Sequence, residues 1–312
     1  MKIALAVPRP KKHSQSKVAV TPIHRVDEAA QLGQFIPLHY HGQMLANEQR
    51  MVPFHEAISK RIPLGSHVVE LGGGTGVMSF LASKRARRVT MVERLPHVAA
   101  AARRLLAANG ASEKVTIVEA DAREFMPDEP ADVVICEMLH SALLREQQIQ
   151  VLSRFKAQHV VQFCRPVARI IPEATILAVQ PIYQPYDFHG YYAPVPFFFE
   201  AGALGSNTIE MGSPHVYSIL EYTEELPESF GLDQIVVINQ AGTVNALRFI
   251  TKVPVGLFAD EQRSADWHLP YMSLALPYPI TVTVGDILRV RFQYDAGGSI
   301  ESLQSSIQAS LA

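Results

Sequence analysis

The stretch from residue 68 to residue 80, VVELGGGTGVMSF, constrains the fold of this chain more than any other. Two β-forming residues lead to Glu70, then to closely spaced glycines, and then to an apolar run that can open a helix. A strand that ends in glycines and continues into a helix exposes backbone N–H groups to a ligand. The dinucleotide fingerprint G-x-G-x-x-G, laid on Gly72 and Gly74, would need a third glycine at Val77. The stretch therefore predicts a nucleotide-type α/β unit. A nicotinamide site and a tight turn without a ligand are the alternatives.

The residues after the glycines continue the alternation of helix and strand. We expect helices at 79–87 and 97–109 and strands at 68–71, 89–92 and 115–118. Glu93 lies 17 residues beyond Gly76, near the separation at which nucleotide folds place an acid on the ribose hydroxyls. A carboxylate suits this role because two vicinal hydroxyls offer it two donors. Asp121, just past the third strand, is either an acceptor for an adenine amino group or a turn residue.

A fourth strand, at 132–136, delivers Glu137 to the edge of the sheet where open α/β folds bind ligands. Glu146 follows nine residues later. On one straight helix, nine steps of about 100° would turn the two acids to opposite faces. They can converge only if 138–145 folds back as a loop. The alternative, which spacing alone favours, makes Glu146 a solvated residue of a helix.

The texture of the sequence changes at Pro172. From Ala174 onward, strand-like runs such as TILAVQPI, NALRFITKV and ILRVRFQY are separated by Gly, Pro, Asn and Asp. This pattern predicts an all-β second half, a barrel or a sandwich. The predicted organisation is thus an N-terminal segment (1–37), to which we assign no chemistry, a Rossmann-like α/β domain (38–172) and a β domain (173–312).

Composition limits the possible partners and compartments. A net charge of −2 gives no footprint for nucleic acid or for an anionic membrane surface, and no apolar run reaches the ~20 residues of a membrane span. Two cysteines do not make a disulfide framework, so we expect a soluble, cytoplasmic protein. His39 and His41 could share a metal, but no third ligand follows at a recognisable spacing, and we expect no metal site.

Several ordered motifs, taken together, resemble the protein arginine methyltransferases from about residue 38 to the C-terminus. HYHGQMLANEQRM is similar to the Tyr-x-x-His-x-x-Met-Leu-x-Asp-x-x-Arg segment of that family, and here 43–49 is expected to be helical, with Pro53 breaking or kinking its continuation. The glycine loop with Glu93 is the second motif. CEMLHSALLRE, with its two glutamates nine residues apart, is the third, and a weaker fourth match places Ala265-Asp266-Trp267 at the Thr-His-Trp loop. The resemblance implies a divergent member of bacterial type.

The family resemblance implies S-adenosylmethionine (SAM) as cofactor and a guanidino group as methyl acceptor. Arg50 would clamp the methionine carboxylate of SAM, and Glu93 would take the ribose hydroxyls. Further cofactor contacts would come from Glu70, Gly72, Gly74, Asp121 and Ala122. Glu137 and Glu146 would grip the substrate guanidinium and so carry the catalysis. His41, Met44 and Trp267 would line the substrate side.

The sequence also departs from the family pattern. Asn47 and Asp266 replace a family Asp–His pair, which makes a proton relay there doubtful and suggests Asp266 as a further acceptor for the guanidinium or an amino group. Arg123 stands where the family usually has an acid. The residues at 138–141 differ from the family's, and Gln148 replaces a methionine, so we expect a more polar pocket wall.

The resemblance leaves the acceptor open among an arginine-containing protein, a peptide, free arginine and another small amine metabolite. It implies a homodimer, for which residues 184–215 would supply the arm. A catalytically weak SAM-binding scaffold is the alternative from another functional class.

Overall fold

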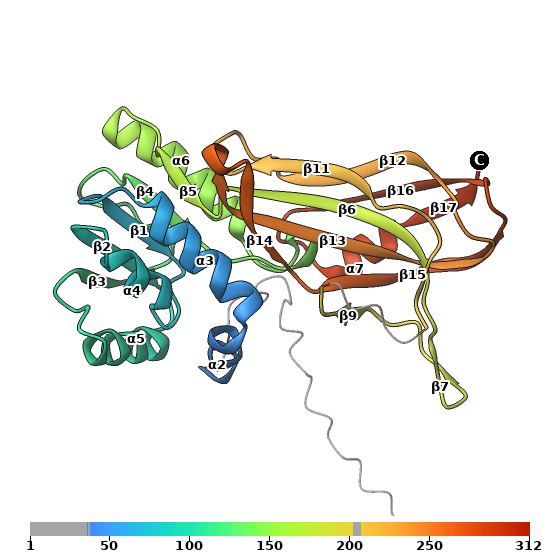
Figure 1. The fold of residues 1–312 in the computed structure, drawn as a ribbon, viewed down its shortest axis with the longest axis horizontal. Helices are drawn as coiled ribbons and strands as arrows, with labels where there is room; N and C mark the ends of the chain where they lie inside the picture. Colours follow the sequence, from blue (N-terminus) through green and yellow to red (C-terminus); the bar gives the residue numbers. More distant parts are fainter. Residues whose placement is uncertain (1–35, 37, 202–206) are drawn as a thin grey trace, which may run out of the picture.

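A computed structural model of the chain describes Ile36 and residues 38–201 and 207–312. The predicted N-terminal segment 1–37 lies outside these residues, apart from Ile36. The chain forms an α/β half followed by a longer all-β half, as Figure 1 shows. Both expected fold classes are confirmed.

The α/β half is built on five parallel strands in the order β3–β2–β1–β4–β5. The strands are β1 (His67–Leu71), β2 (Arg88–Glu93), β3 (Val115–Glu119), β4 (Val133–Cys136) and β5 (Arg169–Ile171). Every residue of β1 and β4 is buried, as apolar strands covered on both faces require. The strand order reverses between β1 and β4, and such a switch point opens a crevice at the carboxyl ends of the strands.

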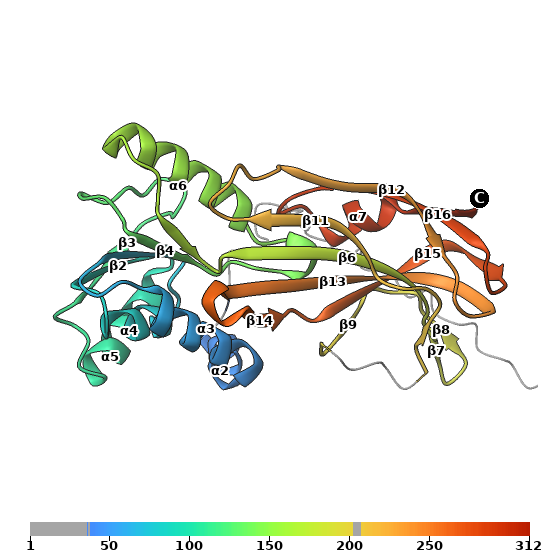
Figure 2. The same ribbon diagram turned by 45° about the horizontal axis from the view of Figure 1, so that its top comes forward.

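Helices cover both faces of this sheet. In Figure 2, α3 (Glu48–Arg61), α4 (Val77–Ser83) and α5 (Pro96–Ala108) lie on one side and α6 (Gln148–Phe163) lies on the other. The predicted helix at 79–87 begins two residues earlier and ends at Ser83, whereas the one at 97–109 is shifted by a single residue.

The expected helix at 43–49 is wrong in its bounds. Two helices occupy the region, α2 (Leu38–Ala46) and α3, and Asn47 separates them as the N-cap of α3. The Asn47 side chain accepts a hydrogen bond from the Arg50 N–H (3.1 Å), which satisfies one of the unpaired donors of the first turn. Pro53 lies inside α3 and does not end it. Phe54 and Ala57, which follow on the same face of the helix, are fully buried, and this packing stabilises the helix despite the proline.

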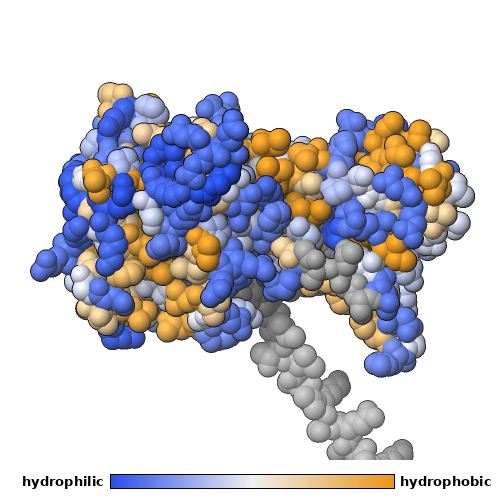
Figure 3. All heavy atoms as spheres, viewed as in Figure 1, coloured by the Kyte–Doolittle hydropathy of each residue, from blue (hydrophilic) through white to orange (hydrophobic). Residues whose placement is uncertain are grey.

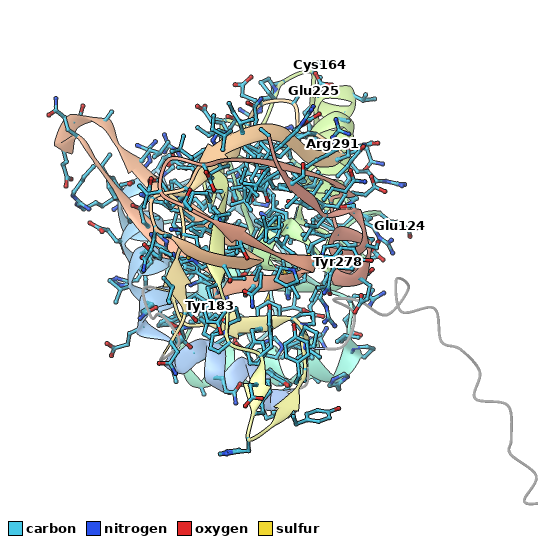
Figure 4. The ribbon with its side chains drawn as sticks, turned by 90° about the vertical axis from the view of Figure 1, so that its right-hand side faces the viewer. Glu124, Cys164, Tyr183, Glu225, Tyr278 and Arg291 are labelled. Atoms are coloured by element: carbon cyan, nitrogen blue, oxygen red, sulfur yellow. The ribbon has the colours of Figure 1, made fainter. Side chains whose placement is uncertain are left out.

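The all-β half consists of antiparallel strands in two main sheets. The larger sheet contains β6 (Ala174–Tyr183), β9 (Phe197–Phe199), β10 (Ile209–Glu210), β11 (His215–Glu221), β13 (Gly242–Phe258), β14 (Arg263–His268) and β15 (Tyr271–Val282). The smaller sheet contains β12 (Ser229–Val237), β16 (Ile287–Asp295) and β17 (Gln308–Leu311), with α7 (Ile300–Ser306) beside β16. Tyr217, Phe249 and Phe292 contact one another between the sheets in edge-on arrangements, and side chains fill this space in Figure 4.

Helix α3 joins the two halves. Its Phe54 ring meets the Trp267 ring of β14 edge-on, with centroids 6.0 Å apart. Gly256 of β13 allows a close approach, because a Cβ atom there would lie 2.9 Å from the Cβ atom of Ala57. Glu56 pairs with Arg263 along the same contact. The switch-point crevice therefore opens beside the β half.

The surface is uneven in character. Figure 3 shows hydrophilic residues over much of the α/β half and a group of hydrophobic residues near the far end of the β half. Exposed apolar side chains of the smaller sheet include Ile235, Val237, Ile287 and Leu311. Among the helices of the described ranges, none is long and apolar enough to cross a bilayer.

Candidate active site

The loop after β1 forms one wall of a cavity that we call the glycine-loop cavity. Gly72, Gly73, Gly74 and Thr75 line it, together with Glu93 at the end of β2 and Asp121 beyond β3. Gly74 has a φ of +55°, and a Cβ atom there would lie 2.7 Å from Cε1 of His41. Any larger residue would therefore meet both strain and a side chain at this position. The bare backbone leaves a cradle for a ligand.

Glu93 is held rigidly at this cavity. Its Oε2 accepts the Gly74 N–H (2.9 Å) and its Oε1 accepts the Leu95 N–H (2.8 Å). Each carboxylate oxygen has a second lone pair, so both can accept a further hydrogen bond from a diol. Glu93 is only 8% exposed, so a ligand in the cavity, more than bulk water, would supply these further donors.

Glu70 is the last residue but one of β1, two positions before Gly72 of the glycine loop. It is 4% exposed and accepts a hydrogen bond from the Ser79 hydroxyl of α4. Burial raises the pKa of Glu70 to about 7, against the lowering effect of the Ser79 hydrogen bonds. Glu70 also lines the glycine-loop cavity, and it fastens α4 to the strand that carries the loop.

The loop between β4 and α6 folds back on itself, as convergence of the two glutamates requires. Ala142, Leu143 and Arg145 have φ values of +57°, +56° and +62°. Three non-glycine residues in the left-handed region mark a backbone that its surroundings hold in place, and such residues cluster at functional sites. Glu146 therefore precedes α6, and the alternative that made it a solvated helix residue is wrong.

Glu137 and Glu146 both line the glycine-loop cavity. The side chain of Glu137 is 10% exposed. Burial, and after it the nearby charge of Glu137, raises the pKa of Glu146 to about 8. The expected rise in the pKa of one glutamate is thus present, although burial contributes more than like-charge repulsion. In the ligand-free protein Glu146 is therefore mostly protonated at pH 7, and a cation bound beside it would favour its ionised form.

Arg50 links the two sides of the cavity. Its Nε–H donates to Glu137 Oε2 (2.9 Å), and its Nη2 bonds the same oxygen. The rings of Phe54 and Trp267 flank the guanidinium, with centroids 5.7 Å and 5.9 Å from Cζ. A guanidinium has five N–H donors, so Arg50 can orient Glu137 and still bind a ligand carboxylate.

A second, outer cavity adjoins the first across Met44, Arg50 and Glu137, which line both. Aromatic rings of Tyr40, His140, Phe198 and Trp267 and the acids Glu48 and Glu200 line it further out. Burial lowers the pKa of His140 to about 4, so its imidazole is neutral at pH 7. The combination of acids, rings and an uncharged histidine suits a cationic ligand.

The structure brings together most of the residues that the sequence analysis selected. Arg50, Glu70, Gly72, Gly74, Glu93, Asp121, Ala122, Met44, Glu137 and Glu146 line the glycine-loop cavity. Trp267 lines only the outer cavity. His41, expected on the substrate side, lines the glycine-loop cavity together with Met44 and the two glutamates, with its ring against Gly74, and burial lowers its pKa.

Asp266 is not brought into this group. It lines a different depression, and its Oδ2 pairs with Lys252 Nζ of β13 (2.7 Å). Asn47 caps α3, so the two residues that replace the family's Asp–His pair have separate partners. The role of Asp266 as an acceptor for the guanidinium thus stays a prediction without a contact to Glu137 or Glu146 among the described residues.

Asp121 is engaged by Arg123, the departure noted in the sequence. Its Oδ1 accepts the Arg123 N–H and Nε–H (2.9 Å and 3.0 Å), and its Oδ2 accepts Nη2 (2.6 Å). These bonds lower the pKa of Asp121. Both residues line the glycine-loop cavity beside Ala122, so Arg123 changes the polarity of this end of the cavity.

The β half holds the folded-back loop, and sequence reasoning missed the residues that do so. Thr251 Oγ1 of β13 accepts the Ala142 N–H (2.7 Å), and Ser141 Oγ donates to the Pro270 carbonyl (2.6 Å). The turn after β16 also contacts the folded-back loop, because the Gly298 carbonyl accepts a hydrogen bond from the Arg145 N–H (2.8 Å). No local motif marks these positions, because each acts across more than a hundred residues of chain.

The residues of the glycine-loop cavity fit SAM. Gly72 and Gly74 line the cavity with backbone alone, and a Cβ atom on either would meet a side chain, Met138 Sδ at 3.0 Å or His41 Cε1 at 2.7 Å. The fixed Glu93 carboxylate suits a ribose diol, and Arg50 suits a carboxylate. The donor and acceptor set therefore matches an amino-acid nucleoside.

Known proteins resemble this chain in both halves. The family described as a methyltransferase domain matches residues 68–158. An uncharacterized protein of Methanothermobacter thermautotrophicus is 31% identical over 274 residues, which cover 86% of this chain and 97% of that protein. A probable protein arginine N-methyltransferase 6 of Arabidopsis thaliana is 30% identical over 148 residues, which cover 46% of this chain and 33% of the relative.

An arginine N(omega)-methyltransferase of Streptomyces achromogenes is 26% identical over 156 residues, covering 48% of this chain and 42% of that protein. The last two matches thus span less than half of either relative. The crystal structure of Arabidopsis thaliana protein arginine methyltransferase 10 superimposes with a TM-score of 0.68 at 17% identity, over 82% of this chain and 87% of that one. This likeness shows a shared fold across both halves. The expected bacterial type stays a prediction.

Proposed function

This chain belongs to the protein arginine methyltransferase family of class I SAM-dependent methyltransferases, and on that basis we propose that it transfers the SAM methyl group to a guanidino nitrogen of an arginine-containing acceptor. Its cofactor is SAM. The observation that carries the proposal is that Glu137 and Glu146 line the same cavity as the glycine loop.

Five residues would hold the cofactor. Arg50 would bind its amino-acid carboxylate, Glu93 its ribose hydroxyls, and Gly72 and Gly74 its backbone-facing side, with Asp121 near the base. When bound, SAM supplies a methyl carbon made electrophilic by the neighbouring positive sulfur. The protein's own contribution is therefore to prepare the nucleophile.

Glu137 and Glu146 would hold the acceptor guanidinium. This group stays protonated at neutral pH, and its nitrogen lone pairs are delocalised. At an effective dielectric near 20, unit charges ~4 Å apart attract by about 4 kcal/mol, so two carboxylates can offset the desolvation of the cation. They also fix its plane, which aims one nitrogen. Glu146, ionised while the guanidinium is bound, is suited to accept the proton that the methylated product loses.

The outer cavity favours an acceptor without a free carboxylate. Glu48, Glu137 and Glu200 line it, and within the described ranges its only basic lining residue besides the neutral His140 is Arg50, which already bonds Glu137. A carboxylate beside the guanidino chain would meet acids there. Arginine within a peptide therefore fits better than free arginine, which the name of the Streptomyces relative makes the main alternative.

The test is mass spectrometry after incubation with isotopically labelled SAM. Acceptors are an acetylated arginine peptide amide, free arginine, agmatine and cell-lysate proteins. We expect label on the peptide at a higher rate than on free arginine. Turnover of free arginine alone would reverse the acceptor preference. Binding of SAM without label on any guanidino compound would favour the scaffold alternative, and label on a non-guanidino amine would favour a small-amine enzyme.

We propose a homodimer as the assembly. The expected arm at 184–215 contains a hairpin of β7 (Asp187–Phe188) and β8 (Tyr191–Tyr192), which projects from the β half in Figures 1 and 2. Phe188, Tyr191 and Tyr192 are 41%, 73% and 63% exposed, a large apolar surface for a two-stranded hairpin. Sedimentation of wild type and of the Tyr191→Ser/Tyr192→Ser double variant tests this, and a wild-type monomer at micromolar concentration contradicts it.

A further inference from the structure

The side chain of Gln148 spans the two peptide groups that flank Glu137. Its Nε2 donates to the Cys136 carbonyl (2.7 Å), and its Oε1 accepts the Met138 N–H (2.9 Å). Gln148 is 1% exposed and is the first residue of α6. The residue expected to make the pocket wall more polar is therefore turned away from the cavity and toward the backbone. That expectation is corrected for Gln148.

Strand pairing explains why these bonds matter. On one side of β4 the register with β1 ends at Leu71–Cys136, and on the other side the register with β5 ends at Ile135–Ile171. Met138 lies beyond both. A glutamine amide carries a C=O and an N–H on one planar group, as a peptide does, so Gln148 supplies the pairing that a neighbouring strand would give.

We propose that Gln148 is a positioning residue that fixes the backbone of Glu137, so that its carboxylate meets Arg50 and the acceptor at a defined angle. The inference rests on the proposed methyl transfer. Gln148 itself touches neither cofactor nor acceptor, since it does not line either cavity. Its effect reaches the reaction only through Glu137.

The chain offers a matched pair of substitutions for the test. Gln148→Met removes both hydrogen bonds at nearly constant volume and leaves Met138 N–H and Cys136 C=O unpaired. Gln162→Met is the control, because Gln162 lies on the same helix, donates its Nε2–H to the Pro127 carbonyl (3.0 Å) and is exposed far from the site. For both variants we would measure kcat with the acetylated arginine peptide amide, the dissociation constant of SAM by calorimetry, and Tm.

We expect Gln148→Met to lower kcat roughly 10- to 100-fold, as small displacements of a positioned group do, with the SAM dissociation constant within about twofold of wild type. Gln162→Met should leave kcat, SAM affinity and Tm near wild type. Wild-type kcat in a folded Gln148→Met variant would overturn the role. So would a loss of kcat that merely follows a loss of SAM affinity.

Gln148→Glu keeps the test decisive where the methionine variant fails to fold. A buried glutamate can donate to Cys136 O only while protonated, so the ratio of variant to wild-type turnover should rise as the pH falls from about 9 to about 6. A ratio that is flat or falls over this range overturns the proposal. Wild-type protein that methylates no guanidino compound would instead overturn the proposed function, which separates the two failures.

Discussion

The two sides of the site are built in different ways. Most of the cofactor side comes from one continuous α/β unit, in which β1, its glycine loop and Glu93 at the end of β2 lie within 27 residues of one another, and Arg50 of α3 completes it. The acceptor side is assembled from distant segments, because α3, the folded-back loop, β9 and the β14–β15 turn all contribute to it. Local sequence therefore specifies the cofactor side, whereas the acceptor side depends on how the two halves pack.

Removing one glutamate should separate these sides most clearly. Glu146→Gln removes a charge from the acceptor grip, and we expect kcat to fall roughly 100- to 1,000-fold, as loss of one electrostatic contact in a closed site does. The SAM dissociation constant should change by less than about twofold, because Glu146 is not proposed to touch the cofactor. Steady-state kinetics and calorimetry measure the two.

The matched control is Glu124→Gln, since the exposed Glu124 side chain points to the surface in Figure 4. Undiminished turnover of Glu146→Gln would remove Glu146 from the acceptor grip and would leave the cofactor side untouched.

Gly74→Ala should act in the opposite sense, on the cofactor side first. The new Cβ atom would meet His41 at 2.7 Å in a left-handed backbone, and we expect SAM affinity to fall at least about tenfold. Gly65→Ala is the control, because Gly65 has a φ of +76° with nothing within 4 Å. It carries the strain without the contact, so Tm should fall in both variants while SAM affinity falls only in Gly74→Ala. Equal SAM affinities would mean that the cradle is not used.

The pH dependence should also distinguish the sides. Below a pKa of about 8 the free Glu146 is protonated, and a bound guanidinium requires it ionised, so the KM for the acceptor should rise roughly tenfold per pH unit as the pH falls below 8. The Glu146→Gln variant lacks this titrating group, so its KM should not depend on pH in this way. KM values for the peptide measured across the range test this, and a KM that is flat from pH 8 to pH 6 contradicts it.

The stability of the ligand-free protein should depend on pH in the opposite direction to acceptor binding. An acid with a raised pKa in the folded state binds more protons folded than unfolded between its unfolded and folded pKa values, so its contribution is lost as the pH rises toward 8. Over this range Tm of the ligand-free wild type should therefore fall relative to Tm of the Glu146→Gln variant, which lacks this titration. A Tm difference between wild type and Glu146→Gln that stays constant from about pH 5 to pH 8 would contradict the raised pKa of Glu146.

The smallest effect should come from the β half. Thr251→Val removes the acceptor of the Ala142 N–H at constant shape, which costs about 1–3 kcal/mol for an unpaired buried donor. We expect kcat to fall a few-fold through the displaced loop, with SAM affinity unchanged. Thr243→Val, on the same strand and half-buried, is the control. Equal kinetics of the two variants would show that Thr251 does not hold the acceptor side.

Particular residues show what the sequence could predict. Glu93 and the glycines were assigned from spacing alone because their partners lie within one supersecondary unit. Convergence of Glu137 and Glu146 could not be decided by spacing, which favoured the wrong alternative, and only the combination of motifs reversed it. Left-handed conformations at Ala142 and Leu143 have no signature, because neither residue type favours them.

Other residues were misplaced for a physical reason. Gln148 reads as a polar pocket residue, but its amide pairs with the backbone on either side of Glu137. Pro53 predicts a helix break, but burial of one face of α3, which includes Phe54 and Ala57, outweighs its missing hydrogen bond. In each case a long-range contact decides an orientation that local sequence leaves free.

The position of α3 limits how this enzyme can be divided. A chain cut after residue 172 would uncover the fully buried Phe54 and Ala57 and would strip Trp267 from the flank of Arg50. The fragment would keep the glycine loop, but it would expose the apolar face of α3 to water and leave the Arg50 guanidinium without the Trp267 ring. The α/β half is therefore not a self-sufficient module, and the β half serves as a structural component of it.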